Sequence, residues 1–127
     1  MFSYKVNPED KEELSRAATA FYELYSEELQ CDPRYTTPDI DSLERIYTVI
    51  VCEDNTGVVG ALCVLDGDVL YPVIKNNYHD VLASLILKAR EVCGPLHAQT
   101  DNEIILTTAV EMGIGVKREG NRLVYAD

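Results

Sequence analysis

Apolar residues recur every three to four positions near the start of the chain, and this spacing predicts an amphipathic helix. Asn7 and Pro8 supply an N-cap and a first-turn proline, so the helix is expected to run from there to about Leu29. Its buried face is expected to consist of Leu14, Ala17, Ala18, Phe21, Leu24 and Tyr25. A loop follows, and a short helix is predicted to start near Thr36–Asp39 and to end near Arg45.

Stretches rich in β-branched residues, separated by short polar turns, predict strands and hairpins. In the first half of the chain they lie at Phe2–Val6, Tyr47–Cys52, Val58–Leu65 and Val69–Ile74. The turns between the last three contain glycine and aspartate, so these strands are expected to be antiparallel neighbours. Pro72 has no N–H to donate to a sheet, so it is expected to mark a strand end or a bulge.

The second half of the chain alternates helices and strands. It predicts a helix at Asp80–Cys93, a strand at Leu96–Gln99, a helix from Asp101 or Asn102 to Met112, and a hairpin of Val116–Arg118 with Arg122–Tyr125. The helix before Leu96 implies a crossover between two parallel neighbouring strands. Hairpins followed by helix–strand units indicate an α+β (mixed α/β) domain.

Composition and charge narrow the possible functions. The 127 residues are 46% hydrophobic, which suits one domain spanning residues 1–127. A net charge of −11 disfavours direct binding to nucleic acid and suits a basic partner. No apolar run reaches membrane length, and early charges such as Lys5 and Glu9 interrupt any signal peptide, so a cytoplasmic protein is expected.

The cysteines and histidines give no metal-binding pattern. They are Cys31, Cys52, Cys63, Cys93, His79 and His97, without a CxxC pair, and no metal site is predicted. Cys52 and Cys63 lie on adjacent predicted strands but roughly 13 Å apart along them, too far for a disulfide. Reduced thiols are therefore expected.

Several segments, taken in order, resemble the GNAT superfamily of acetyl-CoA-dependent N-acetyltransferases. Val49–Ala61 is similar to the family's second hairpin, and Thr100–Asn102 with Ala109–Gly113 is similar to its late helix. Pro38–Glu44 is similar to small acetyltransferase-like proteins of tailed phages. The resemblance implies a central mixed sheet of about six to seven strands with helices on both faces. It also implies acetyl-CoA as cofactor and an amine as acceptor.

The family's glycine-rich pyrophosphate turn is changed in this chain. The aligned stretch Asn76–Ala83 has no glycine, and Asp80 places a carboxylate where a phosphate would lie. Either the N–H groups near Tyr78–Val81 form a remnant site, helped by Lys75 or His79, or Asp80 simply caps the helix. The candidate cofactor-binding residues are Val73, Tyr78, His79, Asp80, Val81 and Asn102.

Catalytic candidates follow from the need to deprotonate an amine and to protonate a thiolate. The helix that carries a tyrosine acid in the family has Thr107 and Thr108 but no tyrosine. Possible bases are Glu53, Asp66 and Asp68 around the central strands, and His97, whose imidazole can be tuned near neutral pH. Of these, Glu53 and His97 are the catalytic candidates.

Three functions are compatible with this sequence. The first is an acetyltransferase acting on an amine, with an acidic surface suited to a cationic acceptor. The second is a non-catalytic phage-type structural or host-protein-binding module with the same fold, placed in the host cytoplasm or the virion. The third is an acidic inhibitor that mimics nucleic acid.

Overall fold

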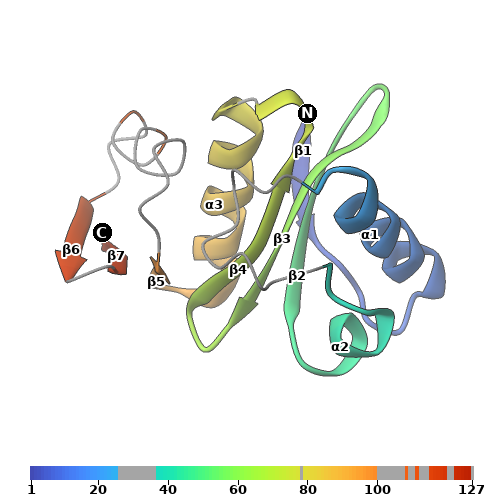
Figure 1. The fold of residues 1–127 in the computed structure, drawn as a ribbon, viewed down its shortest axis with the longest axis horizontal. Coiled ribbons are helices and arrows are strands. Elements are labelled where there is room, and N and C mark those ends of the chain that lie inside the picture. Colours follow the sequence, from blue (N-terminus) through green and yellow to red (C-terminus); the bar gives the residue numbers. More distant parts are fainter. Residues whose placement is uncertain are drawn as a thin grey trace.

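The computed structural model describes residues 1–25, 37–77, 79–99, 108, 111, 115–119 and 122–126. The strands within these ranges form one seven-stranded sheet, and helices pack on it (Figure 1). The strands lie in the order β1-β2-β3-β4-β5-β7-β6. The strand bounds are Phe2–Lys5 (β1), Thr48–Asp54 (β2), Gly57–Leu65 (β3), Asp68–Ile74 (β4), Leu96–Gln99 (β5), Gly115–Glu119 (β6) and Arg122–Ala126 (β7). The helices are α1 (Lys11–Glu23), α2 (Ile40–Arg45) and α3 (His79–Cys93), and η2 (Lys75–Asn77) is a short 3-10 turn.

The sheet is mixed. The strands β1 to β4 are antiparallel neighbours, β4 and β5 are parallel, and β5, β7 and β6 are again antiparallel. The helix α3 connects β4 to β5 within this sheet, which confirms the predicted crossover.

Helices cover both faces of the sheet, as expected (Figure 1). On one face α1 and α2 bury Leu14, Ala17, Phe21 and Leu43 against Val49 and Val51 of β2, Ala61 and Cys63 of β3, and Val73 of β4. On the other face α3 buries Leu82, Leu85, Ile86 and Ala89 against Ile50, Leu62 and Val64. The two sets alternate along β2 and β3 because successive strand residues point to opposite faces.

The bounds predicted for the first helix are wrong at both ends. Asn7 closes a turn before the helix, because its Oδ1 accepts from the N–H of Glu9 at 3.0 Å and its carbonyl from the N–H of Asp10 at 3.0 Å. Asp10 is the true N-cap and accepts from the N–H groups of Glu12 and Glu13. The helix ends at Glu23 rather than near Leu29.

The other predicted elements within the described ranges are confirmed to within two residues. Asp39 caps α2 by accepting from the N–H of Ser42 at 2.8 Å. The helix predicted to end at Met112 falls outside the described residues, except for Thr108 and Glu111, which are helical.

The described cysteines Cys52, Cys63 and Cys93 are free thiols, as expected. Cys52 pairs with Gly60 and Cys63 with Val49, so the two are offset along the hairpin. Among the described helices, none is both long and apolar enough to cross a membrane.

Candidate functional site

The parallel strands β4 and β5 are joined at one end only. Within the described part of the chain, their single paired position is Asp68 with His97. The N–H of His97 also donates to the carbonyl of Gly67 at 2.8 Å. Beyond this point toward Ile74 the two strands no longer pair, so they form a V that is closed at Asp68–His97 and opens toward their C-terminal ends.

A bulge bends β4 inside the V. Ala61 pairs with Val73 and Cys63 with Leu70, so β4 has one extra residue at this position, beside Pro72. Tyr71 adopts a φ of 53°, in the left-handed region that few side chains tolerate. A bulge bends its strand and re-aims side chains, and it interrupts the regular ladder next to the V. We expected Pro72 to mark either a strand end or a bulge, and the structure shows a bulge.

The bulge also changes the face on which Tyr71 lies. Leu70 and Tyr71 are consecutive residues, yet both pack on the face of α1 and α2. There the ring of Tyr71 meets the ring of Tyr47 edge-on, with centroids 5.8 Å apart. An aromatic pair therefore lies on this face of the sheet, close to the closed end of the V.

The open end of the V coincides with the start of α3. The chain leaves β4 at Ile74, passes through η2 with Asn76 at a φ of 54°, and begins α3 at His79. The first turn of a helix has N–H groups without intrahelical partners, and the helix dipole makes this end positive. Asp80 lies inside this turn, one residue after the helix begins, so the prediction that it is the N-cap is wrong.

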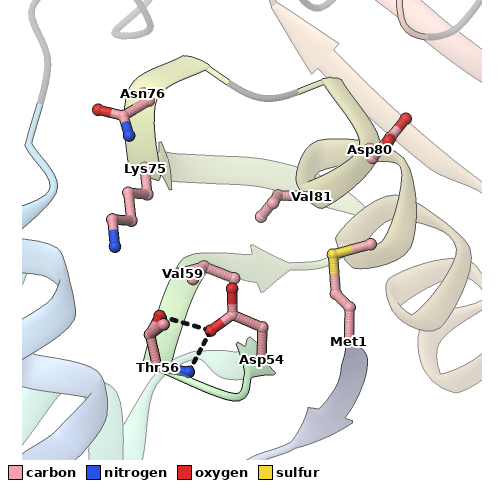
Figure 2. Close-up of a pocket in the computed structure, with 8 residues that line it drawn as sticks. All are labelled: Met1, Asp54, Thr56, Val59, Lys75, Asn76, Asp80 and Val81. Carbon is pink, nitrogen blue, oxygen red and sulfur yellow. Dashed lines mark hydrogen bonds between the residues drawn. The ribbon is translucent and has the colours of Figure 1, made fainter.

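A shallow hollow of about 290 Å³ lies beside the start of α3 (Figure 2). Figure 2 shows Lys75 reaching toward the β2–β3 turn, with Asp80 on the opposite side of the hollow. Asp54 accepts from the N–H and Oγ1 of Thr56 at 2.7 and 2.6 Å. These hydrogen bonds, with a smaller contribution from Lys75, lower the pKa of Asp54. The hollow is lined by Met1, Asp54, Thr56, Val59, Lys75, Asn76, Asp80 and Val81.

The candidate cofactor-binding residues are only partly gathered at this end. Val73 and Val81 are buried: Val73 packs in the cluster that faces α1, and Val81 packs from α3 against the sheet. Asp80 is exposed, and His79 is the first residue of α3. Tyr78 and Asn102 lie outside the described residues.

Glu53, one of the two candidate bases, is held in a side-chain network. The hydroxyl of Tyr4 donates to Oε1 of Glu53 at 3.1 Å, and Nη1 of Arg16 lies 3.5 Å from the same oxygen. Burial, followed by the charge of Glu53, raises the pKa of Tyr4 to about 12. These contacts give Glu53 a role in joining β1, β2 and α1.

The structure does not bring Glu53 and His97 together. Glu53 lies at the end of β2 that is level with the C-terminal end of β4, across β3, whereas His97 pairs with the first residue of β4. The two ends of β4 are roughly 20 Å apart at the usual rise per residue. A single reaction centre cannot use both side chains.

Two of the described thiols, Cys63 and Cys93, are poor nucleophiles. Burial raises the pKa of Cys63 far above its ordinary value and also raises the pKa of Cys93. Because the thiolate is the reactive form, these cysteines suit packing rather than catalysis. Among the described residues, no group of three or more His, Cys, Asp or Glu side chains could hold a metal ion.

The whole arrangement is similar to that of two solved N-acetyltransferases. The N-acetyltransferase from Staphylococcus aureus Mu50 matches with a TM-score of 0.69 at 15% identity, covering 97% of this chain and 95% of its own. The ribosomal-protein-alanine N-acetyltransferase from Brucella melitensis matches with a TM-score of 0.50 at 16% identity, covering 98% and 97%. No protein-family model matches the sequence, and no curated protein is similar to it. At these identities the likeness shows a shared fold.

Proposed function

We propose that this chain, which has a divergent GNAT fold, binds acetyl-CoA between β4 and β5 and transfers the acetyl group to an amine. The observation that carries the proposal is the V between these strands, closed at Asp68–His97 and bordered by the bulge at Tyr71. An extended ligand that carries amide groups can pair with a strand edge where two parallel strands splay apart.

The two ends of the V suit the two ends of such a ligand. The phosphate groups of acetyl-CoA would lie at the open end, where the first turn of α3 and the ammonium group of Lys75 are positive. The thioester would then point toward the closed end, next to Asp68 and His97. This orientation leaves the anionic end in solvent and the reacting end inside the sheet.

Asp80 opposes this binding. Its exposed carboxylate lies in the first turn of α3, where the phosphates would bind, and two negative groups in one helical turn repel each other. The residues present therefore fit the thioester arm better than they fit the phosphates. We infer a weaker complex with acetyl-CoA than a glycine-rich turn would give.

The acceptor proposed here is a cationic amine, such as a protein lysine or an N-terminus. The chain has 22 acidic and 11 basic residues, and its net charge of −11 attracts positively charged partners at low salt. Acceptor preference should therefore weaken as ionic strength rises.

Calorimetry with acetyl-CoA tests the donor, and release of free CoA tests the transfer. The full chain is titrated with acetyl-CoA and, separately, with free CoA, and is then incubated with acetyl-CoA and lysine-rich peptides. Saturable heat followed by acceptor-dependent release of thiol supports an acetyltransferase. Absence of heat at millimolar acetyl-CoA contradicts it.

A second function is favoured by one observation, the carboxylate of Asp80 at the start of α3. A chain that has given up phosphate binding at this turn would keep the fold as a non-catalytic module for a basic protein surface. Such a module predicts no heat with acetyl-CoA or CoA.

A further inference from the structure

His97 and Asp68 form a close pair at the closed end of the V. Oδ1 of Asp68 lies against Nδ1 of His97, within the distance of an ion pair. That Nδ1 is buried and is not aligned for a hydrogen bond with any described group, so Asp68 is the polar neighbour that compensates its burial. The imidazole as a whole remains 27% exposed.

Both side chains lie on the face of the sheet that carries α1 and α2. Their chain neighbours Val69 and Leu96 pack into the cluster under α3. Because strand residues alternate between faces, Asp68 and His97 point to the opposite face. The aromatic pair Tyr47–Tyr71 lies on that same face.

The position of the carboxylate determines what the imidazole can do. A carboxylate beside Nδ1 favours the tautomer with the proton on Nδ1, which leaves the lone pair on Nε2. A methyl group at Gly67 would come within 3.3 Å of Nε2, so a glycine at this position leaves that edge of the ring uncovered. Nε2 is thus the nitrogen available to accept a proton.

We propose that His97 accepts the proton of the acceptor amine and that Asp68 is a positioning residue that fixes its tautomer. This inference rests on the proposed function, because it uses the thioester placed at the closed end of the V. It assigns the reaction to one end of the sheet and excludes Glu53, which lies at the other end.

The proposed step balances as follows. Nε2 of His97 takes a proton from the ammonium group of the acceptor, directly or through one water. The neutral nitrogen then forms a bond to the acyl carbon while the bond from that carbon to sulfur breaks. The departing thiolate takes the remaining surplus proton of the nitrogen, and His97 returns its own proton to solvent.

The tautomer is measured without any ligand. Nitrogen-15 NMR of the wild-type chain should show His97 protonated on Nδ1 at a pH where the ring is neutral. The chain has two histidines, so a His97→Gln variant assigns the signals. Asp68→Asn should shift the population toward the other tautomer. A wild-type His97 protonated on Nε2 overturns the role given to Asp68.

Chemical rescue tests the proton transfer. His97→Ala should lower the rate of acetyl transfer by about a hundredfold or more while the Kd for acetyl-CoA stays unchanged. Added imidazole should restore part of the rate in His97→Ala and should leave the wild-type rate unaffected. His97→Gln, which keeps a polar side chain of similar size, should show the same loss of rate with an unchanged Kd if the alanine variant is unfolded.

The outcomes separate the two proposals. A wild-type chain that does not bind acetyl-CoA overturns the proposed function and the proton transfer with it. Binding followed by full activity in His97→Gln overturns only the assignment of His97. A loss of activity in folded His97→Ala that imidazole does not rescue also overturns it, because a merely structural role would give that result.

Discussion

The partner of each carboxylate matters in this chain, because 22 acidic residues are balanced by only 11 basic ones. Asp54 is held by Thr56, Glu53 by Tyr4 and Arg16, and Asp68 by His97. Asp80 differs from these, since its exposed side chain lies at the positive end of a helix where an anionic ligand would bind. The helix dipole stabilises Asp80 and attracts phosphate by the same interaction, so the two compete.

Replacing Asp80 should therefore strengthen the complex with acetyl-CoA. We expect Asp80→Asn to lower the Kd by about twofold to tenfold at low salt, and by less at high salt, because one nearby negative charge is removed. Calorimetry measures this effect. Glu91→Gln removes the same charge near the other end of α3 and should leave the Kd unchanged. Equal affinities for wild type and Asp80→Asn would place the phosphates elsewhere.

Tyr4 should make the stability of the fold depend on alkaline pH. Its pKa is raised in the folded state from 10.0 to about 12, mainly by burial, so the unfolded chain ionises first as the pH increases. Stability from this group is complete below pH 10 and is lost progressively as the pH rises toward 12. Urea unfolding measures the free energy of unfolding of wild type and of Tyr4→Phe at each pH. The two free energies should converge as the pH rises, because only the wild type loses stability by ionising Tyr4. Parallel curves would contradict the assignment.

At the scale of elements, α3 approaches the sheet closely at one glycine. A Cβ atom built at Gly60 of β3 would lie 2.5 Å from Cγ1 of Val81 and 3.0 Å from Cδ1 of Leu85. Both neighbours are buried, so they cannot turn away into solvent. The absence of a side chain at Gly60 thus sets how closely the crossover helix packs on β3.

A methyl group at this contact should be costly. Gly60→Ala should lower the free energy of unfolding by about 1–3 kcal/mol, as overpacking of a core does. In a Val81→Ala background the same substitution should cost less, because the clashing methyl group is gone. Urea unfolding of the four chains completes a double-mutant cycle. Additive effects would show that the helix moves away from the sheet freely.

Local patterns predicted the elements well, and contacts between distant segments limited the rest. Periodicity and turn residues identified β5 at Leu96–Gln99 without error. The sequence predicted that the strand is interrupted near Pro72. It did not predict that Tyr71 lies on the same face as Leu70, because that depends on how β4 pairs with β3. The pairing of Asp68 with His97 was invisible, since the register of two strands joined by a helix follows from packing rather than from either segment alone.

At the scale of the whole molecule, the sheet consists of two unequal parts. Residues of β2, β3 and β4 belong to both buried clusters, and Leu96 of β5 belongs to the cluster under α3. Among the residues that the structure describes, one paired position, Asp68 with His97, joins the two parts along the sheet. We therefore expect the part formed by β5, β7 and β6 to open more readily than the rest of the sheet.

Hydrogen exchange should detect this division. Amides of β5, β6 and β7 should exchange at least about tenfold faster than those of β2 and β3, because a segment joined to the rest of the sheet at one described position opens locally more easily. Mass spectrometry of peptides from each strand measures the rates. Saturating acetyl-CoA should slow exchange in β5 if the ligand bridges the two parts. Uniform protection over all seven strands would contradict the division.

The order of the strands also protects the chain from aggregation. The short strand β1, with Lys5 at its end, occupies one edge of the sheet and is tied to α3 by a hydrogen bond of 2.6 Å between the hydroxyls of Ser3 and Ser84. Behind it lies β2, whose run from Val49 to Cys52 is apolar and fully buried. An uncovered strand of this kind is a template for fibril growth, so we expect the four residues of β1 to keep β2 from pairing with another chain, and detachment of β1 to start aggregation.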